Sequence, residues 1–368
     1  MQNIDLIGKT VLVTGGIGFI GANLILDLLK TYEPINIVTI DSRTDYYDVS
    51  IKDWRLDEIK KEAEKHPGSC FRFILGDIAD RTLIDRTFAE FRFDIVVNLA
   101  AQAGVRYSIT NPDAYIRSNL IGFYNILEAC RHSYDEINTD PAASYKGVQH
   151  LVYASSSSVY GSNKKIPYST DDKVDNPVSL YAATKKSNEL MAHAYSKLYN
   201  IPSTGLRFFT VYGPAGRPDM AYFGFTDKLI KGETIKIFNF GNCKRDFTYV
   251  DDIVKGVRLV MQNAPEKKNG EDGLPIPPYM VYNIGNNSPE NLLDFVTILQ
   301  EELVRAEILP ADYDFEAHKE LVPMQPGDVP VTYADTSALE RDFGFKPNTT
   351  LREGLRRFAM WYKDFYKI

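Results

Sequence analysis

The 368-residue sequence has little that would support a metal site, a disulfide framework or a membrane span. Its three cysteines, Cys70, Cys130 and Cys243, lie far apart without C-x-x-C spacing, and its five histidines are scattered. This pattern predicts reduced thiols in a cytoplasmic protein without a metal centre. No window approaches about 18 uninterrupted apolar residues. No basic segment followed by a long apolar stretch precedes Thr10. We therefore expect neither a signal peptide nor a membrane partner.

Charge of one sign is not concentrated anywhere along the chain. The 42 Lys and Arg and 49 Asp and Glu residues are interspersed and leave a net charge of −7. No basic stripe is available to neutralise phosphates, so nucleic acid is not an expected partner. The 44% hydrophobic content supports a sizeable core, in one large domain or in two lobes.

The first part of the chain alternates short β-branched runs with amphipathic segments. The runs are "TVLVTG", "INIVTID", "FRFILGDI", "DIVVNLAA" and "HLVYASS", and helical patterns between them include 22–31 and 113–131. This alternation predicts an α/β fold with a doubly wound parallel sheet of the Rossmann type. A strand-like run at 205–211, the strand "TIKIFNFG" and helices near 290–306 and 351–366 indicate a smaller C-terminal α/β lobe. The polar stretches 132–147 and 263–278 resemble surface insertions.

A glycine-rich turn follows the first strand-like run. "TVLVTGGIGFIG" places Gly15, Gly18 and Gly21 between a strand and a helix. Glycines at this spacing permit a tight turn and let the backbone approach a pyrophosphate, whose charge the helix N-terminus stabilises. The turn predicts a dinucleotide site.

Acidic residues end the next two strands. Asp41 follows Gly21 by 20 residues, where a carboxylate can accept hydrogen bonds from ribose hydroxyls and repel a 2′-phosphate, which favours NAD over NADP. Arg43 leaves the NADP alternative open. Asp77, in "GDI", is suited either to the adenine amino group or to capping a helix or turn. The predicted cofactor-binding residues are Gly15, Gly18, Phe19, Ile20, Gly21, Asp41, Asp77, Ile78, Leu99, Ala100, Ala101, Tyr181 and Lys185.

Tyr181 and Lys185 stand four residues apart in "SLYAATKKSNEL" and therefore on one face of a predicted helix. A phenol with a pKa near 10 is a poor base at neutral pH, but an ammonium and a positively charged nicotinamide both favour its phenolate. The pair alone also fits an ordinary amphipathic helix. Together with the glycine turn and a serine-bearing strand end, it predicts a catalytic pair.

The chain also carries the longer segments "NLAAQAGVRYSITNP", "YASSSSVYG", "SLYAATKKSNELMAHAYS", "GLRFFTVYGPAGRPDM", "RDFTYVDDIV" and "MQPGDV". Through these segments, and over nearly its whole length, the sequence resembles the extended short-chain dehydrogenase/reductase family, and within it the NAD-dependent UDP-glucuronate 4-epimerases. The resemblance implies an NAD-binding domain over 1–205 with returning segments near 245–260, and a lobe over 206–368 that mainly binds the UDP-sugar. It also implies a homodimer in which 113–131 and the Tyr181 helix pack against their mates.

The resemblance implies interconversion of UDP-glucuronate and UDP-galacturonate through a 4-keto sugar, with NAD recycled. Tyr181 would take the proton of the sugar 4-hydroxyl, and Lys185 would also bind the nicotinamide ribose. A group among Ser156, Ser157 and Ser158 would hold the 4-oxygen or the C6 group, with Ser156 nearest the 4-hydroxyl.

For the substrate, the resemblance assigns Arg245 to the diphosphate and Asp328 to the uridine ribose, although each alone would also fit a surface ion pair. It assigns the carboxylate to Thr210, Ser157 and Ser158, with a cation nearby at Arg217 and a further one, near the diphosphate, at Arg106.

Two positions bear on the sugar that is accepted. Ala215 stands where related sequences carry tryptophan, which predicts either looser packing around Arg217 or room for a modified substrate. Thr332 stands where galactose epimerases use side-chain size to exclude an N-acetyl group, and its small size leaves N-acetylated sugars open.

Three alternatives share parts of this pattern. A UDP-glucuronate decarboxylase or another UDP-hexose 4-epimerase would share the first oxidation, and a non-catalytic NAD-binding scaffold would share the fold. A 4,6-dehydratase needs an acid and a base where this chain has Ser157 and Ser158, and a serine hydroxyl cannot replace that pair. Dehydration is therefore not expected.

Overall fold

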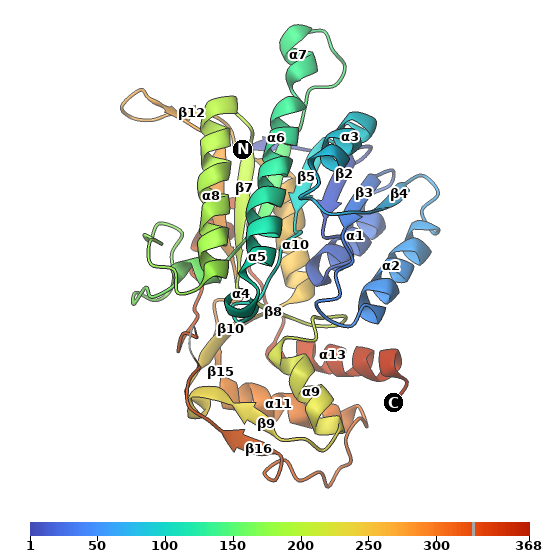
Figure 1. The fold of residues 1–368 in the computed structure, drawn as a ribbon, viewed down its shortest axis with the longest axis vertical. Helices are drawn as coiled ribbons and strands as arrows, with labels where there is room; N and C mark the ends of the chain where they lie inside the picture. Colours follow the sequence, from blue (N-terminus) through green and yellow to red (C-terminus); the bar gives the residue numbers. More distant parts are fainter. Residues whose placement is uncertain (326–327) are drawn as a thin grey trace.

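The computed structural model describes residues 1–325 and 328–368, so that Pro326 and Gly327 of the "MQPGDV" motif lie outside the described residues. Figure 1 shows a large α/β body above a smaller lobe, with the C-terminus at the smaller lobe. Among the described residues, no helix combines the length and apolar character that crossing a bilayer requires.

Seven parallel strands form the central sheet and confirm the doubly wound arrangement. Their order is β14 (Tyr279–Ile284), β7 (Ser203–Phe208), β6 (His150–Ser156), β5 (Ile95–Asn98), β2 (Thr10–Thr14), β3 (Asn36–Asp41) and β4 (Cys70–Leu75). Strands β5 and β7 are buried along their whole length, as expected for a parallel sheet covered on both faces, whereas the edge strand β4 is partly exposed. The strand order reverses between β2 and β5, where open α/β sheets bind ligands.

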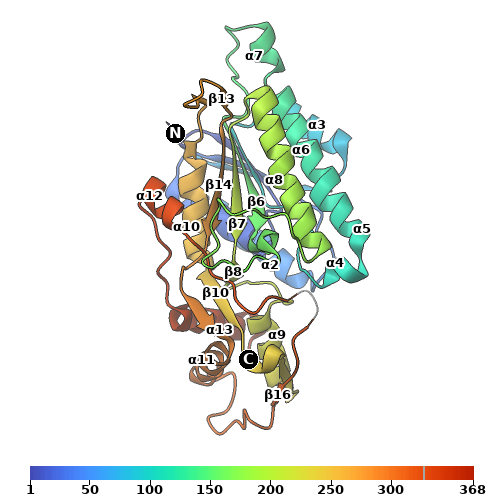
Figure 2. The same ribbon diagram turned by 90° about the vertical axis from the view of Figure 1, so that its left-hand side faces the viewer.

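Helices cover both faces of this sheet (Figures 1 and 2). One face carries α1 (Phe19–Thr31) and α10 (Val250–Met261), with α2 (Ser50–Ala63) beside α1. The other carries α3 (Arg81–Phe91), α6 (Phe123–His132) and α8 (Leu180–Tyr199). Strand β14 returns to the sheet from far along the chain, whereas the division of the chain near residue 205 stays a prediction.

Two segments of the larger body depart from the expected regular structure. The helix expected over 113–131 consists of α5 (Pro112–Tyr115), a π-helical stretch (Ile116–Gly122) and α6. The wide turn carries buried Asn119, whose side chain bonds Gln102 N at 2.8 Å and Thr184 Oγ1 at 3.0 Å. The strand expected over 205–211 divides at Phe209, because the chain leaves the large sheet there and continues as β8 (Thr210–Tyr212) in another.

The smaller lobe combines short sheets with helices. A three-stranded sheet has the order β15 (Pro289–Asn291), β10 (Lys244–Tyr249) and β8, and a two-stranded sheet pairs β16 (Lys319–Leu321) with β9 (Ile235–Ile237). Its helices are α9 (Ala221–Ile230), α11 (Leu292–Arg305) and α13 (Leu351–Tyr366), the last two where the sequence predicts them. Only the start of "TIKIFNFG" is a strand, since residues Phe238–Gly241 form a 3-10 turn in which Asn239 and Phe240 have φ of 52°.

The remaining elements are short. The two polar stretches contain α7 (Asp135–Thr139) and the hairpin of β12 (Lys268–Asn269) with β13 (Pro275–Ile276), which project from the body away from the smaller lobe in Figure 1. The others are β1 (Gln2–Asn3), β11 (Asn263–Ala264), α4 (Tyr107–Thr110), a 3-10 turn (Ser157–Tyr160) and α12 (Ser337–Phe343).

Candidate active site

The glycine-rich turn has no space for side chains. Gly15 has φ of +72°, and a Cβ atom on it would lie 2.8 Å from the backbone nitrogen of Ala100. A Cβ on Gly18 or Gly21 would lie 2.9 or 2.2 Å from the carbonyl oxygen of Gly15. The turn leads directly into α1, so that a phosphate placed against it would meet the N-terminus of a helix.

Asp41 lies at the end of β3 with its carboxylate fixed by two backbone amides. Arg43 N donates to Oδ1 at 2.8 Å and Ile17 N to Oδ2 at 3.3 Å. Burial raises the pKa of Asp41, while these amides and the charges of Lys52 and Arg55 oppose that rise. The carboxylate therefore faces the cavity in a fixed orientation that suits ribose hydroxyls.

The side chain of Arg43, which left NADP open, is engaged elsewhere. Its Nε and Nη2 bind the two carboxylate oxygens of Asp53 at 2.6 and 2.5 Å. Asp77 accepts from Ala79 N and from Arg117 Nε, both at 2.8 Å, so it stabilises a turn as well as facing the cavity. The geometry at Arg43 supports NAD over NADP.

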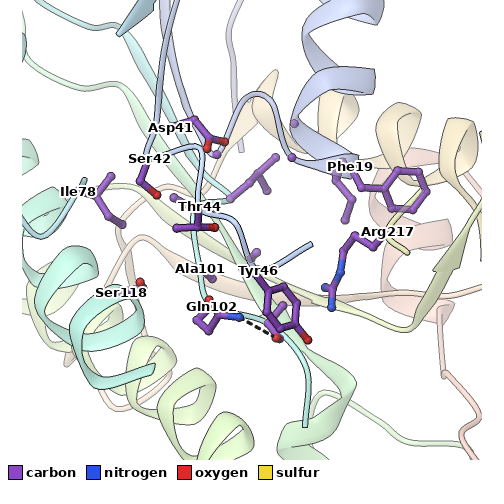
Figure 3. A pocket seen from close by; sticks show the side chains of 18 of the residues that line it. Phe19, Asp41, Ser42, Thr44, Tyr46, Ile78, Ala101, Gln102, Ser118 and Arg217 are labelled. Carbon is purple, nitrogen blue, oxygen red and sulfur yellow. Dashed lines mark hydrogen bonds between the residues drawn. The ribbon is translucent and has the colours of Figure 1, made fainter. Parts of the chain in front are cut away.

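A single cavity at the carboxyl ends of the strands gathers the predicted cofactor residues (Figure 3). It runs from Asp41, Ser42 and Thr44 on one side to Arg217 on the other, and Tyr46 and Gln102 lie between them. The predicted residues that line it are Gly15, Gly18, Phe19, Ile20, Gly21, Asp41, Asp77, Ile78, Leu99, Ala100, Ala101, Tyr181 and Lys185. The lining of this cavity fits a dinucleotide.

Tyr181 and Lys185 project from the first turns of α8. Ser179 caps this helix by accepting a hydrogen bond from Ala182 N at 3.1 Å. Lys185 is 2% exposed, donates to the carbonyl of Ala154 at 3.0 Å, and has a pKa lowered to about 8 by burial. Burial also raises the pKa of Tyr181, against the smaller, lowering effects of the Ser156 hydroxyl and the charge of Arg217. The sequence predicts a lowered pKa for the Tyr181 phenol, whereas the protein groups around it leave that pKa raised.

The four serines at 155–158, at the end of β6 and in the turn after it, have different surroundings. Ser155 is buried, donates to the carboxylate of Glu189 at 2.7 Å and lines the first cavity. Ser156 accepts from Ser158 N at 3.1 Å and thereby caps the 3-10 turn that begins at Ser157. Ser157 and Ser158 face a second cavity.

The second cavity adjoins the first and opens toward the smaller lobe. It is lined by every residue predicted to bind the substrate, Arg106, Ser157, Ser158, Thr210, Arg217, Arg245 and Asp328, and by Thr332. Ser156, Tyr181 and Arg217 line both cavities. The phenol of Tyr181 thus lies where a molecule in one cavity would meet a molecule in the other.

Arg217 has a partner that the sequence analysis did not identify. Its Nε and Nη2 bind the carboxylate of Asp219 at 2.9 and 2.5 Å, and the hydroxyl of Tyr46 donates to Asp219 at 3.2 Å. Burial raises the pKa of Asp219, but the charge and hydrogen bonds of Arg217 outweigh it and leave that pKa lowered. The charge of Arg217 is therefore largely balanced inside the cavity.

The far end of the second cavity is cationic and aromatic. Arg106 lies 5.1 Å above the ring of Phe238 and 3.4 Å from a carboxylate oxygen of Asp328. Arg245 donates to the carbonyls of Lys244 and Pro330 at 3.1 and 3.2 Å. An exposed ion pair of this length contributes little to stability, which leaves Arg106 available to a phosphate.

Several lining residues escaped sequence analysis, among them Tyr46, Lys52, Gln102 and Asp219. Tyr46 and Lys52 follow Asp41 in the loop after β3 and at the start of α2, where the only signal is the end of a parallel strand. Asp219 lies in the quoted "GPAGRPDM" segment, only two residues after Arg217. A charge two residues from a predicted cation was the available signal.

Comparisons with known proteins agree with this geometry. Residues 11–285 match the NAD dependent epimerase/dehydratase family. UDP-glucuronate 4-epimerase 4 of Arabidopsis thaliana is 44% identical over 365 residues, covering 98% of this chain and 76% of that protein, and Protein CapI of Staphylococcus aureus is 48% identical over 363 residues, covering 97% and 99%. The crystal structure of UDP-glucuronic acid 4-epimerase from Bacillus cereus, in complex with UDP-glucuronic acid and NAD, is similar with a TM-score of 0.78 and 29% identity, covering 97% of this chain and 100% of that one. On its fold, its glycine-rich turn and these matches, the chain belongs to the NAD dependent epimerase/dehydratase family.

Proposed function

We propose that the protein is an NAD-dependent 4-epimerase that interconverts UDP-glucuronate and UDP-galacturonate through a 4-keto intermediate. The observation that carries this proposal is the position of Tyr181 and Ser156 on the boundary between a cavity lined by the glycine-rich turn and one lined by hydroxyls and cations. The similarity to UDP-glucuronate 4-epimerases supports the same substrate class.

The chain's own residues hold the sugar and move its proton. NAD, when bound, would supply the hydride acceptor and donor for the sugar C4. Tyr181 takes the proton of the 4-hydroxyl as the 4-keto sugar forms and gives it back after the sugar has rotated. Ser156 donates to the 4-oxygen, and the ammonium of Lys185 favours the phenolate of Tyr181 together with the positive nicotinamide.

The uronate carboxylate suits the hydroxyl end of the second cavity. Ser157, Ser158 and Thr210 offer neutral donors there, and the charge of Arg217 is already balanced by Asp219. Hydroxyls can bind the carboxylate in either sugar orientation without a fixed ion pair, which helps the ring to rotate. Arg106 and Arg245 would meet the diphosphate, with Asp328 at the uridine ribose.

The decisive experiment incubates the purified protein and NAD with UDP-glucuronate and follows the sugar signals by NMR. We expect UDP-galacturonate to accumulate to an equilibrium that is reached from either sugar. Conversion to UDP-xylose would indicate a decarboxylase instead, and exclusive turnover of UDP-glucose would indicate a neutral-sugar epimerase. Absence of turnover with tight NAD binding would favour a non-catalytic role.

The pKa of Lys185 predicts how kcat changes with pH on the alkaline side. Its burial lowers the pKa to about 8, so the ammonium that supports the Tyr181 phenolate is lost as pH rises through that value. We expect kcat to fall with a midpoint at or below pH 8, and Lys185→Arg, whose guanidinium stays charged, to lack this decline despite a lower maximum. The measurement is kcat against pH at saturating substrate. An unchanged decline in Lys185→Arg would assign the titration to another group.

We also propose that the protein is cytoplasmic and forms a homodimer. Its free thiols at Cys70, Cys130 and Cys243 suit a reducing compartment. Helix α8 exposes 61% of Leu190 and 68% of Leu198, and the neighbouring helical segment exposes 48% of Ile121 and 45% of Tyr124. Figure 2 shows α8 and α6 side by side on one face, where two copies could pack their helices together.

Dimer formation through this face is tested by Leu190→Glu. A carboxylate at the centre of an apolar helix interface is costly to bury, so light scattering after gel filtration should show the variant shifted toward monomer. Leu274→Glu, at a position 63% exposed in the hairpin between β12 and β13, is the control and should keep the wild-type mass. A dimer that persists in a Leu190→Glu/Leu198→Glu variant would place the interface elsewhere.

A further inference from the structure

Arg55 is a buried cation outside all the roles assigned above. It lies on α2 and is 1% exposed, among the largest fully buried side chains of the described residues. A buried charge is unfavourable unless it is closely hydrogen-bonded, so its retention here requires an explanation.

The guanidinium of Arg55 joins the glycine-rich turn of the first cavity to the loop that leads to Arg217, which lines both cavities. Its Nη1 donates to the carbonyl of Ile17, within the glycine-rich turn, at 3.0 Å. Its Nε and Nη2 donate to the carbonyl of Ala215 at 3.0 and 2.6 Å, and Nη2 also to that of Gly216 at 2.9 Å. One planar cation thus binds the cofactor loop and the loop that carries Arg217.

The fifth contact of Arg55 is also neutral. Its Nη1 donates to the hydroxyl of Tyr47 at 2.8 Å, and the guanidinium carbon lies 5.7 Å from the centre of that ring. All of these partners in the described structure are carbonyl or hydroxyl oxygens, which fix direction through the geometry of the guanidinium fork. The contacts therefore orient backbone instead of forming a salt bridge.

The two loops are held in place from both sides. The amide of Ile17 donates to Asp41 at 3.3 Å while its carbonyl accepts from Arg55. Ala215 has φ of +52°, which is unfavourable for a residue with a side chain, and a Cβ on Gly216 would lie 1.8 Å from the hydroxyl of Tyr222. Arg217 follows these two residues directly, so its position between the cavities depends on their backbone.

We propose that Arg55 is a positioning residue that couples the NAD-binding turn to the loop of Arg217. It deepens the proposed function and rests on it for the identity of the sugar substrate. The coupling also accounts for Ala215: its carbonyl fixes the loop through Arg55, so the small, 5% exposed side chain does not leave the loop loose. This argues against looser packing, one of the two alternatives that the sequence leaves open at that position, whereas room for a modified substrate stays a prediction.

The test compares Arg55→Lys with Arg258→Lys. A lysine keeps the charge at position 55 but cannot reach three carbonyls in the plane of a fork. Arg258, on α10, is 2.7 Å from Asp27, outside both cavities, and serves as the matched control. The measurements are the dissociation constant of NAD for the cofactor-stripped protein, and kcat/KM for UDP-glucuronate.

We expect Arg55→Lys to raise the NAD dissociation constant and to lower kcat/KM, each by about ten-fold or more, because small displacements of catalytic groups are costly. Arg258→Lys should leave both near wild-type values. Combined with Arg217→Lys, Arg55→Lys should lower kcat/KM by less than the product of the single effects, since both act through one loop.

Other outcomes would overturn the coupling. If Arg55→Lys lowers the unfolding temperature while the folded protein keeps both constants, Arg55 has a purely structural role. If Arg55→Lys does not fold, Arg55→Gln, which removes the charge and keeps two donors, is measured in the same way, and failure of both variants to fold also assigns a purely structural role. If the wild-type protein does not turn over UDP-glucuronate, the proposed function fails, whereas the NAD constants still test the cofactor side of the coupling.

Discussion

Replacing Tyr181 by phenylalanine is expected to lower kcat by about 10³-fold or more while NAD binding stays unchanged. The substitution removes a single oxygen at the boundary of the two cavities, and the remaining ring fills nearly the same volume. Without the phenol, the described residues beside it offer no replacement base: Ser156 is a hydroxyl, and the ammonium of Lys185 donates to the carbonyl of Ala154. The loss should therefore appear in kcat and spare substrate affinity.

Tyr195→Phe is the matched control for this variant. Tyr195 lies on the same helix, and its hydroxyl donates to Glu128 at 2.8 Å, away from both cavities. Its loss should lower stability by about 1 kcal/mol and leave kcat unchanged. Turnover by Tyr181→Phe within ten-fold of wild type would show that another group moves the proton.

Sequence patterns predicted the parts of this site that local backbone geometry dictates. Gly15 must adopt a positive φ with a strand close by, and Asp41 must end a parallel strand, so both carry a signal at fixed spacing. Tyr181 and Lys185 are likewise tied by the repeat of one helix. Their placement around one cavity follows from the strand order, which the alternation of strand and helix patterns already indicates.

Contacts between distant segments were not predictable in the same way. Arg55 binds Ala215 across 160 residues, and Tyr46 binds Asp219 across 173 residues, and nothing in the local pattern of either partner requires the other. The break at Phe209 has the same origin, because an uninterrupted apolar run does not reveal that its two halves pair in different sheets. Tertiary packing decides these features.

One of the serines at 155–158 also contacts a buried ion pair that the sequence analysis did not predict. Glu189 and Arg207, each with a side chain 3% exposed, are joined by Nε–Oε1 and Nη2–Oε2 contacts of 2.8 and 2.9 Å. Ser155 donates to the same carboxylate at 2.7 Å. The ion pair therefore holds Ser155 in place near the end of β6, immediately before Ser156.

Arg207→Met is expected to destabilise the protein by about 3 kcal/mol or more, measured as the free energy of unfolding in urea. The variant leaves the carboxylate of Glu189 buried, with Lys186, at 3.2 Å, as its remaining charged partner among the described residues. The double variant Arg207→Met/Glu189→Gln removes the unpaired charge as well and should recover part of the loss. Equal destabilisation by the single and double variants would show that packing of Arg207, and not its charge, is what matters.

The pH dependence of stability gives the Arg207→Met variant a signature of its own. In the wild-type protein, burial alone would raise the pKa of Glu189, but the hydrogen bonds and charge of Arg207 outweigh burial and lower it. A carboxylate with a lowered folded-state pKa contributes stability above its unfolded pKa, near 4.3, and loses that contribution as pH falls through the folded value. With Arg207 removed, burial dominates and raises the pKa, so protonation now favours the folded state. The deficit of Arg207→Met relative to wild type should therefore be largest near neutral pH and shrink as pH is lowered toward 4, and a deficit independent of pH would contradict the electrostatic explanation.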